Sequence, residues 1–162
     1  MTVSKQSEHI QYGALPWRRG RGGLEILLVT TLNTKRWIVP KGWPLAGHAP
    51  AECAEHEALE EAGLLGKMQP KPLGSFPYEK SSRGGDNLSC NVLLFAMEVK
   101  QQRRLWPEKK LRETRWCSVE EALERVSNPG LRSLIQEFAE DWHSRTTDRP
   151  DSVAVTHEQQ KS

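Results

Sequence analysis

The sequence predicts a domain of the α/β or α+β class, in which helices are interspersed among the strands of a mixed sheet. Two observations indicate this class. Apolar runs rich in Val, Leu and Ile alternate along the chain with segments whose apolar residues recur at helical spacing. The length of 162 residues fits one domain, whose core needs no disulfide or structural metal. We expect that domain at residues 11–143, between polar tails at residues 1–10 and 144–162.

Five strands are expected from the apolar runs. Residues 12–18 and 24–29 have the composition of strands, and an Arg- and Gly-rich turn separates them. Residues 37–39 form a third, short run that ends before a proline. Further strands are expected at residues 71–79 and 89–99, the latter rich in Val, Leu and Phe.

The first helix is expected at residues 50–65. Pro50 suits a first helical turn, Ala and Glu dominate the segment, and Gly63 or Gly66 can end it. Small residues fall on one face of this helix and let it pack closely against a sheet. This face carries Ala51, Ala54, Ala58, Ala62 and, at its end, Leu65.

Two more helices are expected after Trp116, where a strand gives way to a helix. Ser118 and Glu121 have the spacing of a capping box, which begins a helix that runs to about Val126. The last helix is expected at residues 131–142. Its apolar residues have helical spacing: Leu131, Leu134, Ile135, Phe138 and Trp142.

The composition narrows the class of protein. Lys and Arg number 23 and Asp and Glu number 21, and this net charge of +2 is too balanced for a protein that coats nucleic acid. No apolar run approaches the roughly 18 residues of a membrane span, and the first residues lack the apolar stretch of a secretory signal. The three cysteines are widely spaced, which argues against a disulfide framework. We therefore expect a cytoplasmic protein without a membrane segment.

Three glutamates on the first helix are the candidate metal ligands. Glu57, Glu60 and Glu61 stand at positions i, i+3 and i+4, which lie on one side of a helix. Carboxylates that share a patch repel one another, and partial burial strengthens the repulsion unless a divalent cation neutralises it. Hard oxygen ligands of this kind suit Mg²⁺ or Mn²⁺. A solvated acidic helix face is the simpler interpretation of the same residues.

The segment from Gly42 to Leu64 resembles the Nudix hydrolase signature G-x5-E-x7-R-E-U-x-E-E-x-G-U, where U is a bulky aliphatic residue. The matching residues are Gly42, Glu57, Glu60, Glu61, Gly63 and Leu64. The departures are His48 for Glu, His56 for Arg and Ala58 for the first aliphatic residue. Chance would match five of the seven fixed letters in only about half a percent of chains of this length, at roughly 7% usage per letter.

The resemblance extends over about residues 11–140. The run Arg-Trp-Ile-Val-Pro-Lys-Gly at residues 36–42 looks like the strand and loop that precede the signature in the diphosphoinositol polyphosphate phosphohydrolase branch. Residues 116–122 resemble the start of the helix that closes a Nudix domain. The resemblance implies an α/β/α sandwich around a mixed sheet. It also implies hydrolysis of a diphosphate linked to another group, usually with Mg²⁺.

Carried onto this chain, the resemblance makes Glu57, Glu60 and Glu61 the metal ligands, with help from backbone carbonyls near Lys41 or Gly42. Alternatively, one of the three glutamates deprotonates the attacking water. In such metal-assisted phosphoryl transfer, cations neutralise the phosphate oxygens and lower the pKa of bound water. Glu108 and Glu113 come late enough in the chain to supply a further ligand from a loop.

Basic residues near the signature are expected to bind a phosphate-rich small molecule, since each phosphate adds negative charge. The expected substrate-binding residues are Arg18, Lys35, Arg36, Lys41 and Arg83. Arg83 belongs to a Gly-containing loop that could cover phosphates, and Trp43 is the tryptophan placed to contact a base. For any single basic residue, a solvated surface is the usual alternative. Whether the chain forms a monomer or a dimer stays open.

The expected substrate is a diphosphoinositol polyphosphate or a dinucleoside polyphosphate, followed by a nucleoside diphosphate linked to a sugar. Two other classes of function are alternatives. One is a Nudix-like module that binds nucleotides and hydrolyses them slowly, because His48 and His56 weaken the signature. The other is nucleic-acid binding through the basic stretches, which would depend steeply on salt concentration and which the modest net charge argues against.

His56 generates a first prediction. In the family, an Arg at this position holds a carboxylate of the signature, whereas the imidazole of His56 is a shorter donor. Replacing His56 with Arg is therefore expected to raise the affinity for Mg²⁺ or Mn²⁺, or the turnover, both measured against the wild type. A fall in both quantities would show that the histidine is a specific adaptation of this chain.

Overall fold

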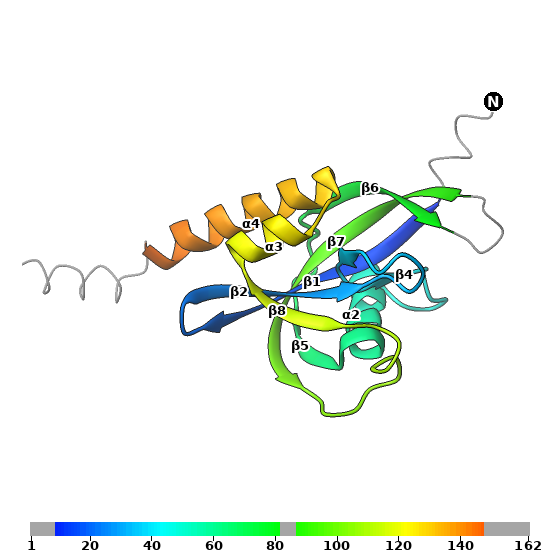
Figure 1. Cartoon of the computed structure of the whole chain (residues 1–162), viewed down its shortest axis with the longest axis horizontal. Helices are drawn as coiled ribbons and strands as arrows, with labels where there is room; N and C mark the ends of the chain where they lie inside the picture. The colour runs from blue at the N-terminus through cyan, green and yellow to red at the C-terminus, as the bar shows by residue number, and fades with distance from the viewer. Residues whose placement is uncertain (1–8, 82–86, 148–162) are drawn as a thin grey trace, which may run out of the picture.

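The computed structural model describes residues 9–81 and 87–147 of the chain. This part contains one mixed sheet of eight strands and three helices, shown in Figure 1. The strands are β1 (Ile10–Gly20), β2 (Gly23–Thr30), β3 (Trp37–Ile38), β4 (Lys41–Gly42), β5 (Leu64–Met68), β6 (Gly74–Ser81), β7 (Asn87–Gln102) and β8 (Thr114–Ser118). The helices are α2 (Pro50–Ala62), α3 (Val119–Arg125) and α4 (Pro129–Thr147).

The sheet is built around the parallel pair β1 and β7. Its main order is β3-β2-β1-β7-β5, with β4 added to β1, β6 to β7 and β8 to β2. Every pair except β1 and β7 is antiparallel. The parallel pair extends from Ile10 beside Asn91 to Trp17 beside Glu98. Strands far apart in the sequence therefore form the centre of the sheet, which is mixed as predicted.

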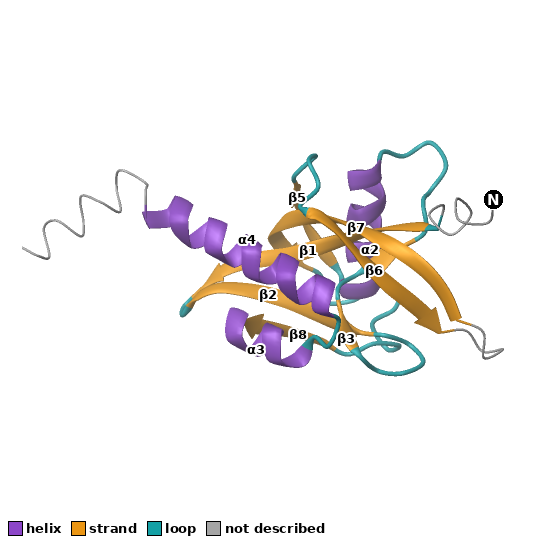
Figure 2. Cartoon of the chain, turned by 90° about the horizontal axis from the view of Figure 1, so that it is seen from above, coloured by secondary structure: helices purple, strands orange, loops and turns teal. Residues whose placement is uncertain are grey.

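The helices cover the two faces of the sheet. In Figure 1, α3 and α4 lie above β1 and β2, whereas α2 lies below them. Figure 2 shows α4 passing over the sheet, with α2 on the other side of β7. This layering confirms the predicted α/β/α sandwich. None of the helices in the described ranges has the length and hydropathy that a membrane-spanning helix requires.

The small-residue face of α2 lets the helix lie directly on the sheet. Ala54, Ala58 and Ala62 are completely buried and belong to the same core as Leu15 and Phe95 of the central strands. Alanine has no side-chain rotamers to lose on burial, so this close approach costs little conformational entropy. The helix that carries the candidate glutamates is consequently held firmly against β1.

The first helix ends at Ala62, three residues before the predicted end. Gly63 adopts a left-handed conformation with φ 71° and forms the C-terminal cap. The chain then enters β5, in which Leu64 pairs with Gln102 and Leu65 with Gln101. Leu65 was expected on the helix face. It belongs to a strand instead, because the glycine reverses the backbone before that residue.

The remaining elements differ from the predicted ones mainly at their ends. The β6 strand covers Gly74–Ser81, where residues 71–79 were expected, and β7 extends beyond both predicted ends. The last helix continues to Thr147, so that residues 144–147 of the expected tail are helical. These shifts follow from strand pairing and helix packing, which local composition does not specify.

Only one of the two hydrogen bonds of the predicted capping box at Ser118 is present. The Ser118 hydroxyl accepts a hydrogen bond from the Glu121 N–H at 3.1 Å. The Glu121 carboxylate does not return to the backbone of Ser118. It accepts hydrogen bonds from Arg115 and Arg125 instead, at 2.5 and 2.9 Å. Two nearby guanidinium groups have thus replaced the second half of the capping box.

Gly63 generates the second prediction. A Cβ atom at this position would overlap the indole ring of Trp106, and the positive φ is unfavourable for any other residue. Gly63→Ala is therefore expected to lower the free energy of unfolding by about 1–3 kcal/mol, measured by urea denaturation. Gly22→Ala is the matched control, because nothing lies within 4 Å of a Cβ atom there. Equal stability of the two variants would contradict the expectation.

Candidate active site

A cavity of about 720 Å³ opens beside α2, where residues from several strands and loops meet. Helix α2 contributes Glu57 and Glu61, and β4 contributes Lys41 and Gly42. The other elements that line it are β1, β3, β6, β7, the start of α4, and the loops that follow β2, β4, β7 and α3. Their polar and aromatic contributions include Gln11, Thr31, Asn33, Thr34, Arg36, Trp37, Trp43, Tyr78, Glu79, Lys80, Ser89, Cys90, Glu108, Arg112, Ser127 and Asn128.

The carboxylate of Glu57 lies against the backbone of Gly42. A Cβ atom at position 42 would overlap this carboxylate, so only glycine leaves room for it. Burial raises the pKa of Glu57, while nearby His56 opposes the shift. The Glu61 side chain also lowers this pKa, so the two carboxyl groups lie near each other. The glycine that begins the signature is therefore in direct contact with its first glutamate.

Glu61 is the most buried of the three glutamates, with 4% of its surface exposed. Its Oε2 atom lies 3.4 Å from Nη2 of Arg112. Its Oε1 atom is buried and has no hydrogen-bond partner in the described part of the chain. Burial raises the pKa of Glu61 to about 8, although Arg112 and Lys41 oppose this shift. A buried acceptor without a partner is costly, and here it lines a cavity that can hold a ligand.

Lys41 brings a positive charge to the cavity that Glu57 and Glu61 line. Its Nζ atom lies 4.1 Å from the ring centroid of Tyr78, a cation–π contact. Burial lowers the pKa of Lys41 to about 8, and the neighbouring Glu61 carboxylate opposes this. The Lys41 ammonium group and the Glu61 carboxyl group thus lie near each other, and both are shielded from water. A phosphate oxygen or a cation that enters the cavity would find a charged partner there.

Glu60 is turned away from the other two glutamates. Its side chain is 35% exposed, lies 3.9 Å from Nε2 of His56 and does not line the cavity. Successive residues are 100° apart around a helix, so Glu60 and Glu61 point in different directions while Glu57 lies between them. No group of three or more His, Cys, Asp or Glu residues in the described ranges has the arrangement of a metal site. The metal role of Glu60 stays a prediction.

The residues that line the cavity nevertheless fit a divalent cation. Glu57, Glu61 and Glu108 bring three carboxylates to it, and within residues 9–81 and 87–147 Glu61 Oε1 has no hydrogen-bond partner. Hard carboxylate oxygens in a partly buried site are the ligands that Mg²⁺ and Mn²⁺ prefer. Glu113, the other late acid, does not line the cavity. Its backbone pairs with Thr30 instead.

The loop between β7 and β8 is attached to the C-terminal end of α2. The last carbonyl groups of a helix have no partners within the helix, and here the end of β7 and this loop donate hydrogen bonds to them and to the cap residue. Four such bonds are present: from Gln102 Nε2 to Ala62 (3.0 Å), from Trp106 Nε1 to Glu61 (3.1 Å), from the Glu108 N–H to Glu60 (3.0 Å) and from the Arg103 N–H to Gly63 (2.8 Å). This attachment brings Glu108 and Arg112 to the cavity.

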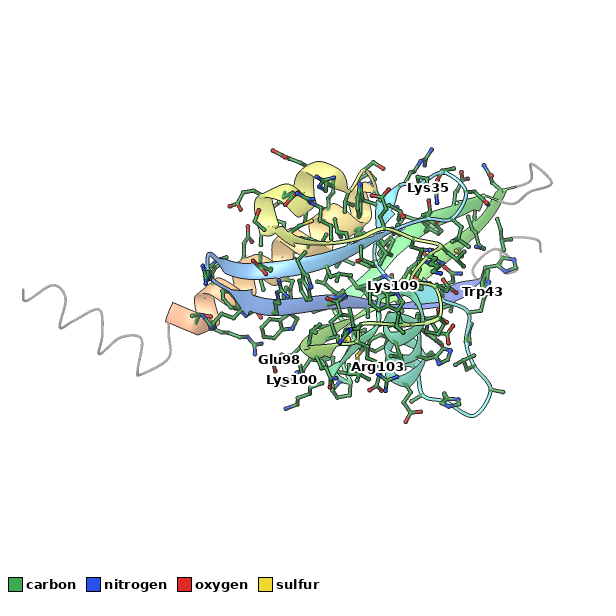
Figure 3. The ribbon with its side chains drawn as sticks, turned by 60° about the horizontal axis from the view of Figure 1, so that its bottom comes forward. Lys35, Trp43, Glu98, Lys100, Arg103 and Lys109 are labelled. Carbon is green, nitrogen blue, oxygen red and sulfur yellow. The ribbon has the colours of Figure 1, made fainter. Side chains whose placement is uncertain are left out.

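The expected substrate-binding residues separate into two groups. Arg36 and Lys41 line the cavity, as does Trp43, the tryptophan expected to contact a base. Lys35 does not line it. The Nζ atom of Lys35 donates to the carbonyl of Leu111 at 3.4 Å, and Figure 3 shows this side chain on the outer part of the loop after β2. Arg83 lies outside the described residues.

Arg18 lies away from the cavity, near the opposite end of β1. Its guanidinium group pairs with Glu25 at 2.7 Å and stacks 3.9 Å above the ring of Trp116. The strand spans eleven residues, and it is Gln11, at its other end, that lines the cavity. The expectation that Arg18 gathers around the signature is therefore not met, because Arg18 lies near the far end of the strand from Gln11.

Among the lining residues that the sequence analysis did not include in the site, three are notable. Gln11 is 2% exposed and its Oε1 atom has no partner among the described residues. A glutamine within an apolar strand was the available signal for it. Arg112 belongs to a basic stretch whose other members gave no reason to single it out. Tyr78 gave no sequence signal, because its role depends on Lys41 lying over its ring.

Comparison with known proteins supports this fold. The family model described as "NUDIX domain" matches residues 8–138. The chain is 32% identical over 141 residues to Nudix hydrolase 13, mitochondrial, of Arabidopsis thaliana, covering 82% of this chain and 68% of that protein. It is 36% identical over 118 residues to Nudix hydrolase 12, mitochondrial, of the same plant, covering 71% of this chain and 58% of that protein. The chain therefore belongs to the Nudix family, and it spans only part of the length of these relatives.

Solved structures show the same fold at low sequence identity. A Caenorhabditis elegans Ap4A hydrolase in a binary complex has a TM-score of 0.64 and 20% identity, covering 84% of this chain and 98% of that chain. The Nudix domain of Shewanella oneidensis NrtR, complexed with ADP ribose, has a TM-score of 0.64 and 13% identity, covering 84% and 89% of the two chains. Membership of the family supports hydrolysis of pyrophosphate linkages as the class of reaction.

The raised pKa of Glu61 generates the third prediction. The folded metal-free protein holds the proton of this carboxyl more tightly than the unfolded chain, so its free energy of unfolding falls as the pH rises from about 4.5 to about 8. Glu61→Gln lacks this titration. Relative to the wild type it should gain at least about 1 kcal/mol across the window, since one pKa unit corresponds to about 1.4 kcal/mol.

Urea unfolding in the presence of a chelator measures this gain. The lowered pKa of Lys41 affects stability above the window, between about 8 and the ordinary value of 10.5. Glu60→Gln is the control, because the Glu60 carboxylate lies outside the cavity lining. A gain of the same size in Glu60→Gln, or a constant difference between Glu61→Gln and the wild type, would refute the interpretation.

Proposed function

We propose that this chain hydrolyses a diphosphate linkage in a phosphate-rich small molecule, with Mg²⁺ or Mn²⁺ as cofactor. The observation that carries the proposal is Oε1 of Glu61, which has no hydrogen-bond partner among the described residues and is buried in a cavity that Glu57, Lys41 and Arg36 also line. Acids for a cation and bases for phosphate thus meet in one place. Family membership supports the same class of reaction.

The residues of the cavity divide the work of such a reaction. Glu57 and Glu61 would hold the cation, with Glu108 as a third carboxylate from the loop. When bound, the cation neutralises phosphate charge and lowers the pKa of a bound water. Lys41 and Arg36 are placed to bind phosphate oxygens and orient the linkage. Because Glu60 lies outside the cavity lining, we assign the base that takes the proton from water to Glu57 or Glu61.

The charge of the cavity favours a nucleotide over an inositol polyphosphate. Among the described lining residues, Arg112 is paired with Glu61 and Glu108, which leaves Arg36, Lys41 and Lys80 to bind phosphate. A diphosphoinositol polyphosphate carries a phosphate at most ring positions and needs more cations than these. We therefore rank a dinucleoside polyphosphate, or another nucleoside diphosphate derivative, first. The diphosphoinositol compound is second, on the resemblance of residues 36–42.

Aromatic and amide groups support the nucleotide. Trp43 is exposed and lines the cavity beside the signature, where its ring offers a surface on which a base can stack. Stacking of this kind contributes about 1–3 kcal/mol per base. Gln11 offers a buried amide oxygen that has no hydrogen-bond partner in the described part of the chain and can accept one from a ligand. Ap4A and ADP ribose, which two structural neighbours are named for, are suitable members of a test panel.

A panel of diphosphate compounds gives the fourth prediction. With Mg²⁺ or Mn²⁺, the wild type should release phosphate or nucleotide from at least one of Ap4A, ADP ribose and a diphosphoinositol polyphosphate. Glu61→Gln should lower the turnover by about 10²-fold or more, because the buried carboxylate is lost from the cavity. Glu124→Gln, on the exposed side of α3, is the control and should keep full turnover.

The same panel separates the enzyme from a binding module. Binding of a nucleotide without turnover would favour the module. Release of products by the wild type that is lost in Glu61→Gln would favour the enzyme. If none of the compounds were hydrolysed or bound, the proposed function would be wrong.

A further inference from the structure

Arg112 occupies the space between two carboxylates and the backbone of β2. Its side chain is only 11% exposed. The Nε atom donates to Glu108 Oε1 at 2.8 Å, and Nη1 donates to the carbonyl of Thr30 at 3.0 Å. The Nη2 atom lies 3.4 Å from Glu61 Oε2. We propose that Arg112 is a positioning residue that holds the Glu61 carboxylate so that its second oxygen, Oε1, faces the ligand.

The anchoring of Arg112 makes it able to position another group. A guanidinium group is planar, and three of its nitrogens are engaged here in three different directions. The contact with β2 is reinforced on both sides, because Thr30 and Glu113 exchange a backbone bond of 3.1 Å and a hydroxyl bond of 2.9 Å. The strand therefore fixes the guanidinium, and the guanidinium fixes one oxygen of Glu61.

A purely structural ion pair would leave a different pattern. Buried charges in cores are stable when all their hydrogen-bonding positions are satisfied. Here Glu61 Oε2 is beside Arg112, whereas Oε1 has no partner among the described residues and Glu61 lines the cavity. Arg112 thus holds the Glu61 carboxyl group in a defined orientation, while its Oε1 has no hydrogen-bond partner among the described residues. That pattern is typical of a group kept available for a ligand.

The basic residue on α2 itself does not perform this role. The imidazole of His56 is 46% exposed and its Nε2 atom lies 3.9 Å from Glu60, on the side of the helix away from the cavity lining. Arg112 reaches Glu61 from the loop between β7 and β8, which the carbonyl groups of α2 hold in place. The cation that orients the helix carboxylate therefore comes from a segment about 50 residues further along the chain.

The kinetic test compares Arg112→Lys and Arg112→Ala with the wild type, on the panel compound that the wild type hydrolyses. This part rests on the proposed function. Both variants are expected to lose at least about tenfold in kcat with KM changed by less than about threefold, because lysine keeps the charge but not the fork of donors. Methylguanidinium added to Arg112→Ala should restore part of the kcat, and methylammonium should not.

The matched control is Arg115→Lys. Arg115 also pairs through Nε with a glutamate, Glu121, but it lies on β8 outside the cavity lining. Wild-type kcat in Arg112→Lys would overturn the proposal. A raised KM with unchanged kcat would overturn it as well, because it would make Arg112 a direct contact of the substrate. An equal loss of kcat in Arg115→Lys and Arg112→Lys would also overturn the proposal, because it would mean that both changes act by lowering the stability of the fold.

A second measurement is independent of turnover. In metal-free protein labelled with ¹³C, the carboxyl resonance of Glu61 is assigned by its absence in Glu61→Gln. Arg112→Lys should shift or broaden this resonance, whereas Arg115→Lys should leave it unchanged. An unaltered Glu61 resonance in a folded Arg112→Lys would overturn the proposal. If the wild type hydrolysed nothing on the panel, the proposed function would fail, and this measurement would still decide whether Arg112 holds Glu61.

Discussion

The site depends on the hydrogen bonds between the end of α2 and the loop that follows β7. A helix leaves its last carbonyl groups without partners, and burying them unpaired would be costly. Here an amide, an indole and two backbone N–H groups of the loop satisfy them in turn. Gly63 makes this possible, because its lack of a Cβ atom leaves room for the ring of Trp106. Helix and loop therefore form one unit, and the cavity lies beside it.

This unit brings opposite charges together out of water. Glu57 and Glu61 come from the helix, Glu108 and Arg112 from the loop, and Lys41 from β4. Moving strongly buried ions such as Glu61 and Arg112 out of water costs several kcal/mol each, and their mutual attraction only partly offsets this cost. The raised pKa of Glu61 and the lowered pKa of Lys41 are consequences of the same burial. A ligand that combines cations with phosphate oxygens would satisfy both sets of groups.

Sequence patterns anticipated some of these residues and missed others for identifiable reasons. Helical spacing placed Glu57 and Glu61 on one side of a helix, and both line the cavity. The same spacing grouped Glu60 with them, although 100° of rotation separates it from Glu61. Charge and proximity in sequence favoured Arg18, but β1 carries it to the other end of the strand. The β5 strand was absent from the expected elements, because its residues continue the apolar composition of the helix beyond Gly63.

The class of fold, the Nudix signature and the helix that carries it could be read from the residues alone, because periodicity, caps and motif spacing are properties of short segments. Which acids face the cavity, and which cation orients them, depends on how the folded elements come together. Arg112 meets Thr30, 82 residues away, and Glu61 through strand pairing and loop attachment. Gln11 reaches the same cavity from the first strand. Such contacts depend on the relative placement of distant segments, which no local pattern of residues specifies.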